Sequence, residues 1–194
     1  MIFQVFLTFD TKRYHSQIGG PMTETSQRVV EAIEDEDSIE DMYLTFEVET
    51  EEYAVCIESV TEIVTNQRII PAPDMPVYIT GVINLRGKVV PLMDIRLRFG
   101  LPKKEYDDRT CIIVVEIDEI PTGLMVDRVK DVLEIPKENI EPPKYGKGDG
   151  VIEGMGKREE QVSFVISLPK LLSSNKVDID IDQLREISGN ETNE

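Results

Sequence analysis

The sequence predicts an all-β protein made of two small β-barrels in tandem, with a few short helices. Three observations predict this class: an internal repeat, alternation of apolar and polar residues within each copy, and prolines that exclude helix between the strands. Strands at short, regular spacing favour closed barrels, because closure removes exposed strand edges. A chain of 194 residues can form one domain, or two small ones, whose core needs no disulfides.

An internal repeat relates residues 42–87 to residues 111–156 at a constant offset of 69. The apolar period of the first copy carries over to the second. The copies also share one proline and two glycines, in the pairs Pro73 with Pro142, Gly81 with Gly150, and Gly87 with Gly156. Two β-rich segments can resemble one another by composition, but composition does not place these three residues at one offset. We therefore interpret the chain as containing a duplicated subdomain.

Each copy is predicted to begin with a β-hairpin. In the first copy, residues 42–48 alternate between apolar and polar side chains, and a second alternating run follows at 53–57. A short helical turn is expected around residues 58–64. Prolines then force extended backbone and exclude helix, at Pro71, Pro73 and Pro76 in the first copy and at Pro136, Pro142 and Pro143 in the second.

A second hairpin is predicted further along the first copy. Strands at 79–84 and 89–93 flank a tight turn at 85–88, which connects them directly. Gly87 suits a left-handed position in that turn, because glycine has no Cβ to clash with the backbone.

A short helix is expected to close each copy. In the first copy, Asp94 can cap a helix over residues 95–99 that ends at Gly100. The second copy has a strand at 162–168 followed by a helix that starts at Pro169, a position where proline is tolerated.

The net charge of −17 belongs mainly to the two ends of the chain. Residues 31–52 carry eleven acids and no base, residues 178–194 carry a net charge of −5, and residues 53–177 carry only −2. Acidic blocks of this kind usually stay solvated and disordered.

Three regions are therefore predicted along the chain. They are a disordered acidic N-terminal segment at 1–41, a folded domain at 42–174 with repeat units at about 42–100 and 111–174, and an acidic C-terminal tail at 175–194. Because Met22 opens a segment that resembles an ordinary soluble N-terminus, we expect residues 1–21 to be a non-native extension.

Composition excludes several classes of function. An acidic chain with few aromatic residues lacks the basic footprint that phosphate neutralisation requires, which argues against nucleic-acid binding. No stretch approaches the roughly 20 apolar residues that span a bilayer, and no positive charge precedes the apolar start at 2–7. We expect a cytoplasmic protein without direct membrane insertion. Cys56 and Cys111 lie in apolar runs, which favours a structural role for both.

The inventory of reactive residues argues against an enzyme. The only histidine, His15, lies in the N-terminal segment, and the sequence has no metal-ligand cluster and no glycine-rich phosphate-binding loop. The acid pairs Asp107-Asp108 and Asp118-Glu119 fall at predicted turns, where exposed connectors are expected. The sequence therefore predicts no catalytic residue, no metal and no cofactor, with a hydrolytic enzyme as a remote alternative.

One segment carries a specific family motif. Residues 81–96 read Gly-Val-Ile-Asn-Leu-Arg-Gly-Lys-Val-Val-Pro-Leu-Met-Asp-Ile-Arg and are followed by Phe99-Gly100-Leu101. This run resembles the signature segment of CheW-like domains. Three further motifs support the resemblance, namely Val60-x-Glu62-Ile63, Gly123-Leu124-x-Val126-Asp127-x-Val129 and Lys170-Leu171-Leu172-Ser173. Together the motifs cover about residues 42–174.

The resemblance implies a fold of two intertwined five-stranded barrels of the SH3-like kind. It also implies a chemotaxis adaptor that joins the cytoplasmic tip of transmembrane chemoreceptors to the regulatory domain of the histidine kinase CheA, in arrays at the inner face of the membrane. An adaptor of the same fold in another chemosensory pathway, such as one controlling surface motility, is the alternative. Ser167 and Pro169 replace acidic residues that are typical of the family's last strand.

The candidate partner-binding residues are Val60, Glu62, Asn84, Arg86, Gly87 and Lys88. Features that the barrel requires should occur in both copies, so features that occur once are candidates for function. At the repeat offset, Gly87 is matched by Gly156, whereas Arg86 falls on Met155 and Asn84 falls on Glu153. Residues 81–104 also contain a basic cluster, in which Asp94 is the single acidic residue. The basic residues are Arg86, Lys88, Arg96, Arg98, Lys103 and Lys104. We interpret this cluster as a candidate partner surface.

Each assignment has a structural alternative. Arg86 can be a solvated turn residue, and the basic cluster a solvated face. Glu62 is matched by Asp131 in the second copy, so an acid there can simply solvate the turn; Val60, matched by Val129, can be a core residue. The functional interpretation requires that the two halves share a topology and that Arg86 is not enclosed in an internal ion pair.

Overall fold

The computed structural model describes residues 41–65, 67–143, 150–158 and 161–173. All of them belong to the compact unit that starts at Asp41. The predicted acidic segment, its proposed start at Met22 and the acidic tail from 175 onward lie outside the described residues.

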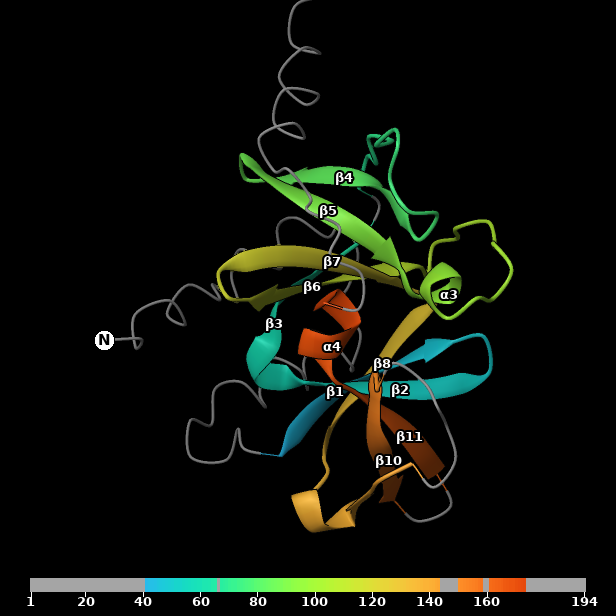
Figure 1. The fold of residues 1–194 in the computed structure, drawn as a ribbon, viewed down its shortest axis with the longest axis vertical. Helices are drawn as coiled ribbons and strands as arrows, with labels where there is room; N and C mark the ends of the chain where they lie inside the picture. The colour runs from blue at the N-terminus through green and yellow to red at the C-terminus, as the bar shows by residue number, and fades with distance from the viewer. Residues whose placement is uncertain (1–40, 66, 144–149, 159–160, 174–194) are drawn as a thin grey trace, which may run out of the picture. The chain divides into compact units, whose positions relative to one another are not determined.

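The described residues of the first half form five strands and two short helical segments (Figure 1). They are β1 (Met42–Val48), β2 (Glu51–Cys56), η2 (Ile57–Ser59), β3 (Val60–Val64), β4 (Ile79–Leu85), β5 (Lys88–Asp94) and α3 (Ile95–Arg98). The two predicted hairpins are β1–β2 and β4–β5. Asp94 caps α3 as expected, since its Oδ1 accepts a hydrogen bond from the Leu97 amide at 3.2 Å.

The second half follows the same plan. Its elements are β6 (Cys111–Ile117), β7 (Ile120–Val126), β8 (Arg128–Glu134), η3 (Lys137–Asn139), β9 (Ile140–Glu141), β10 (Ile152–Arg158), β11 (Gln161–Ile166) and α4 (Leu168–Ser173). The all-β class is therefore confirmed. The predicted helix at Pro169 is also confirmed, because this proline is the second residue of α4.

The helical turn expected at 58–64 is wrong. Only Ile57–Ser59 forms a 3₁₀ turn, and Val60–Val64 is strand β3, paired antiparallel with β6. The β-branched residues Val60, Thr61, Ile63 and Val64 dominate this run and favour extended backbone.

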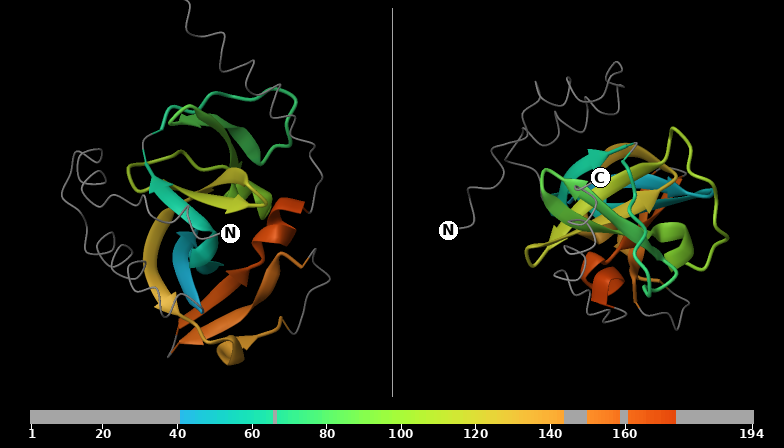
Figure 2. Two further views of the ribbon diagram at one scale, coloured as in Figure 1. Left: turned by 90° about the vertical axis from the view of Figure 1, so that its left-hand side faces the viewer. Right: turned by 90° about the horizontal axis from the view of Figure 1, so that it is seen from above.

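The strands form two sheets, and each sheet draws strands from both halves of the chain (Figure 2). The orders are β8-β1-β2-β11-β10-β9 and β3-β6-β7-β5-β4. Barrels in tandem, each made from one repeat, are therefore wrong, whereas the intertwined arrangement is correct. Among the described residues, strand pairing does not close either sheet into a full barrel.

The two halves share a topology despite one change in repeat offset. Strands β1 to β3 match β6 to β8 at the predicted offset of 69, whereas β4 matches β10, and α3 matches α4, at an offset of 73. The pairings are also equivalent, since β3 pairs with β6 as β8 pairs with β1, and β5 lies parallel to β7 as β11 lies parallel to β2. The first requirement of the functional interpretation is met.

The changed offset corrects the predicted match between Gly87 and Gly156. Gly156 lies within strand β10, where a Cβ would meet Ile135 at 2.9 Å, and not in a turn. The position equivalent to Arg86 is Glu159, outside the described residues, and not Met155. The offset rises from 69 to 73 between β8 and β10, and a gapless comparison cannot accommodate this change.

Each sheet has its own apolar core. Ile83, Leu92, Ile112 and Met125 pack together in the five-stranded sheet, and Tyr43, Ala54, Ile135 and Val165 do so in the six-stranded one. Short helix α4 lies between the sheets in Figures 1 and 2, and its Leu168 and Leu171 are buried.

Candidate partner-binding site

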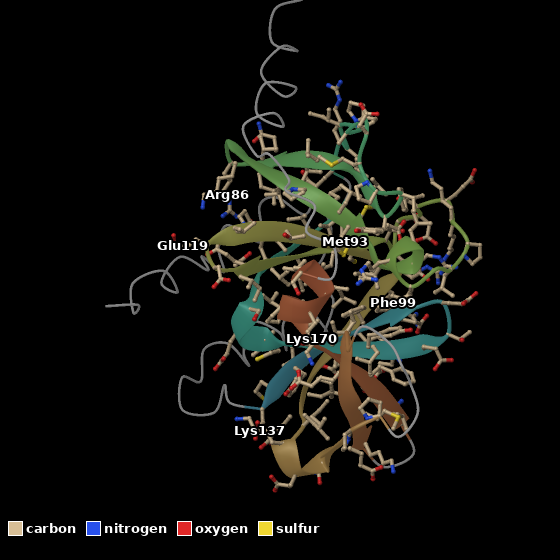
Figure 3. All side chains as sticks on the ribbon, in the orientation of Figure 1. Arg86, Met93, Phe99, Glu119, Lys137 and Lys170 are labelled. Atoms are coloured by element: carbon tan, nitrogen blue, oxygen red, sulfur yellow. The ribbon has the colours of Figure 1, made fainter. Side chains whose placement is uncertain are left out.

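The tip of the β4–β5 hairpin carries most of the predicted site. Leu85 pairs with Lys88, so Arg86 and Gly87 form a two-residue turn. Their φ angles are +51° and +84°, which is the pattern of the type I′ turn that fits the natural twist of a hairpin. The side chain of Arg86 extends away from the tip (Figure 3).

Arg86 forms an ion pair with Glu62, with 3.1 Å between Nη2 and Oε2. The Arg86 side chain is nevertheless 76 % exposed and that of Glu62 is 21 % exposed. This pair lies on the surface, so Arg86 is not enclosed in an internal ion pair. The second requirement of the functional interpretation is also met.

The Arg86–Glu62 pair also connects the two edges of the five-stranded sheet. Glu62 lies on β3 at one edge, and Arg86 follows β4 at the other. The curled sheet therefore brings together two residues that are 24 positions apart in the sequence. Exposed ion pairs contribute at most about 1 kcal/mol, so a partner can replace this one at small cost.

The remaining predicted residues divide by burial. Asn84, Gly87 and Lys88 are exposed, and the Asn84 Oδ1 accepts a hydrogen bond from the Gly87 amide at 2.8 Å. Val60 is only 8 % exposed and pairs with Val115, which favours the core alternative for its side chain. The structure thus brings Glu62 together with the β4–β5 hairpin that carries Asn84, Arg86, Gly87 and Lys88, whereas Val60 is buried in strand β3.

Acidic residues lie beside this tip. Strand β7 runs parallel to β5, with Leu92 opposite Gly123, so the Asp118-Glu119 turn is at the same end of the sheet as Lys88. Figure 3 shows Glu119 next to Arg86. Asp118 and Glu119 have φ angles of +52° and +64°, which confirms the predicted turn. The surface therefore offers adjacent positive and negative groups.

The predicted basic cluster does not form one surface. Arg96 is only 8 % exposed, Arg98 stacks over the Tyr78 ring at 5.6 Å, and Lys104 lies 4.0 Å from Asp107. These residues follow the far end of β5, a seven-residue strand about 23 Å long at the usual rise. Proximity in sequence was misleading because strand β5 separates the two groups of charges, which lie at its opposite ends. The basic part of the candidate site is therefore Arg86 and Lys88 alone.

Arg96 instead belongs to a junction between the sheets that sequence reasoning missed. Its Nη1 lies 2.6 Å from the Asp127 Oδ2, and Asp127 is the single residue between β7 and β8. The same oxygen accepts a hydrogen bond from the Glu49 amide at 2.7 Å. Both residues stand in family motifs, but no spacing rule places residues 31 positions apart in contact.

The comparisons with known proteins agree on one family. Residues 42–176 match the family model described as the CheW-like domain. The chain is 33 % identical to the chemotaxis protein CheW of Klebsiella aerogenes over 138 residues, which are 70 % of this chain and 83 % of that protein. It is 35 % identical to the CheW of Bacillus subtilis over 132 residues, 66 % of this chain and 85 % of that protein.

A solved structure agrees with these sequence relatives. The crystal structure of the scaffolding protein TtCheW from Thermoanaerobacter tengcongensis superposes with a TM-score of 0.65 at 34 % identity, covering 70 % of this chain and 94 % of that one. The chain belongs to the CheW family. CheW membership makes the protein a chemotaxis adaptor, and the motif of residues 81–96 is the β4–β5 hairpin with its helix.

One departure from the CheW motif has a structural counterpart. At the offset of 73, Ser167 stands where Asp94 stands in the first half, directly before helix α4. Serine is as favourable as aspartate at the position that precedes a helix, because its hydroxyl can accept from a backbone amide. Replacement of the acid is therefore compatible with the fold of this CheW-family chain.

The described part of this CheW-family chain contains no cluster of three or more metal-ligating side chains and no helix long and apolar enough to span a membrane. Cys56 and Cys111 are half-buried, and burial raises the pKa of both thiols, which disfavours the reactive thiolate form.

Proposed function

We propose that this CheW-family adaptor couples transmembrane chemoreceptors to the histidine kinase CheA, in arrays at the inner face of the membrane. The adaptor acts by binding and carries out no chemistry. Its receptor contact is the tip formed by Glu62, Asn84, Arg86, Gly87 and Lys88.

The exposed Arg86–Glu62 ion pair is the observation that carries this proposal. It presents a guanidinium on the hairpin tip beside a carboxylate from β3, and both are exchangeable because a surface ion pair is weak. Arginine suits such a role, since its planar fork can bind a partner carboxylate through two parallel hydrogen bonds. A partner with one acid and one base at matching spacing can replace both halves of the pair.

Chemoreceptors present a helical hairpin at their cytoplasmic tip. Recognition of a helix rests on apolar contact area, with charged groups that fix its orientation. A single contact of this size gives modest affinity. Arrays gain strength by linking many weak contacts, so coupling to the kinase should strengthen receptor binding without any new contact at the tip.

The test is co-sedimentation of the full chain with receptor-bearing membranes, with and without CheA. Arg86→Glu changes a side chain that is 76 % exposed, so we expect the variant to fold normally. Its reversed charge lies beside Glu62, so we expect it to lose recruitment. Arg109→Glu is the matched control, because Arg109 is 71 % exposed and also pairs with an acid, Asp107 at 3.7 Å. It lies away from the tip and should be recruited like the unmodified protein.

Recruitment of Arg86→Glu at the unmodified level would remove Arg86 from the receptor site. Equal loss in both charge reversals would point to a general effect of net charge, and would equally contradict the proposed site.

A further inference from the structure

The Arg86 backbone adopts a conformation that its residue type disfavours. Among the described residues, six besides glycine have positive φ, and Arg86 is the one cationic residue of the six. Type I′ turns prefer asparagine, aspartate or glycine at both central positions. Gly87 satisfies this preference at the second position, whereas Arg86 violates it at the first. Violations of this kind concentrate at functional sites.

Two contacts hold the turn in this conformation. Glu62 binds the guanidinium from β3, the opposite edge strand of the sheet, and Asn84 accepts the 2.8 Å hydrogen bond of the Gly87 amide with its Oδ1. This bond runs from Gly87, the second central residue of the turn, back to Asn84, which precedes the paired residue Leu85. It therefore restrains Arg86, which lies between the two groups that it joins.

The amide oxygen of Asn84 is thus committed to the backbone of its own turn. A direct role for Asn84 in partner recognition would need that oxygen to leave Gly87 and release the restraint on Arg86. The two roles compete for the same atom.

We infer that Asn84 is a positioning residue, which holds Arg86 in its left-handed conformation so that the guanidinium points at the partner, and that its Oδ1 does not contact the partner. This inference rests on the proposed function of Arg86. It reassigns Asn84 from a contact residue to the residue that makes the Arg86 contact available.

The experiment is a double-mutant cycle on the full chain, read by a co-sedimentation titration with receptor-bearing membranes. Asn84→Ala removes the acceptor and should weaken binding about threefold to tenfold, the worth of one hydrogen bond. Asn84→Asp keeps an acceptor at the same place and should bind within about twofold of the unmodified protein. In an Arg86→Ala background, Asn84→Ala should cause no further loss.

A local readout separates positioning from a general structural role. Hydrogen exchange at the Gly87 amide should accelerate in Asn84→Ala and stay slow in Asn84→Asp, while the melting temperature changes little in either. A role that is merely structural would weaken binding in both backgrounds and lower the melting temperature.

The outcomes distinguish this inference from the proposed function. Losses that add in the double variant would show that Asn84 touches the partner itself, and would overturn the inference alone. Normal binding by Asn84→Ala would also overturn it. Normal binding by Arg86→Ala would instead remove the proposed receptor site, and with it the reason to position Arg86.

Discussion

The carboxylate of Asp127 and the guanidinium of Arg96 meet at 2.6 Å, at the place where the chain passes from one sheet into the other. Both side chains are nearly buried, with exposed fractions of 14 % and 9 %. With one oxygen atom, Asp127 binds Arg96 of helix α3, which follows β5 of the five-stranded sheet, and the Glu49 amide in the β1–β2 turn of the six-stranded sheet. This carboxylate therefore joins both sheets at a single point.

Removal of one partner should be costly. Asp127→Ala leaves the nearly buried Arg96 guanidinium with only the more distant Glu49 carboxylate, 3.9 Å from its Nη2. Breaking a buried pair costs about 3–5 kcal/mol of unfolding free energy, and we expect a loss near the lower end because Glu49 remains. Urea denaturation measures the loss. Arg128→Ala is the control, because Arg128 lies 2.7 Å from Glu47 but is 47 % exposed, so its loss should stay within about 1 kcal/mol. Equal losses in the two variants would contradict the assigned role of the junction.

Arg86→Asn should separate stability from binding. Asparagine is preferred at the first central position of a type I′ turn, so the variant should be as stable as the unmodified protein or more stable, by up to about 1 kcal/mol. Receptor binding should be lost because the guanidinium is gone. Thermal melting measures the stability of the variant, and membrane co-sedimentation measures its receptor binding. A variant that loses stability would show that Arg86 serves the fold.

Gly81→Ala should destabilise the β4 edge. A Cβ at Gly81 would collide with the backbone carbonyl oxygen of Ile70, which accepts the Val82 amide hydrogen bond at 2.8 Å. Overpacking costs about 1–3 kcal/mol, and this case should lie at the upper end because backbone cannot move aside easily. In Gly100→Ala the new Cβ meets no atom within 4 Å, so only strain of about 1 kcal/mol is expected. Denaturant midpoints of both variants test the difference.

Tyr106 should affect stability at alkaline pH. Burial, together with the Asp94 carboxylate that accepts its hydroxyl hydrogen bond at 3.1 Å, raises the pKa of Tyr106 to about 12. In the unfolded chain the pKa is about 10, so above pH 10 the unfolded state loses a proton that the folded state keeps. The stabilisation is complete below about pH 10 and is lost as pH rises toward 12.

The comparison of unmodified protein with Tyr106→Phe measures this effect. From pH 9 to pH 11, the urea midpoint of unfolding should fall further for the unmodified protein than for Tyr106→Phe. The raised pKa values of Tyr43 and Tyr53 are common to both proteins and cancel in the difference. Parallel pH profiles would mean that the Tyr106 hydroxyl is not buried against Asp94.

The hairpins could be predicted from the sequence because their signals are local. Alternation over residues 42–48, Gly87 in a tight turn and Asp94 before a helix each act within a few residues, and all three are as expected. The helical turn at 58–64 failed because only Glu58 and Ser59 of that segment are helical, and the rest form strand β3, which pairs with the distant strand β6. Pairing across the sequence overrides local preference.

The site was only partly predictable for the same reason. The family motif identified Arg86 and Glu62 separately, but their contact depends on a sheet that curls until its edges meet. The basic cluster was wrong because sequence neighbours on a long strand end far apart. The Arg96–Asp127 contact could not be predicted from the sequence, since neither the charge pattern nor the repeat spacing relates the two residues.

Because each sheet takes strands from both repeats, neither repeat is a folding unit. Fragments cut within residues 101–110 would each lack partner strands, and should regain structure only when mixed. Four of the nine strand pairs among the described residues join positions at least 31 apart in the chain, so folding should be slower than for a domain built from hairpins alone. An ancestral single repeat would have needed a second copy of itself before it could form either sheet, which makes a strand-exchanged homodimer the natural forerunner of this chain.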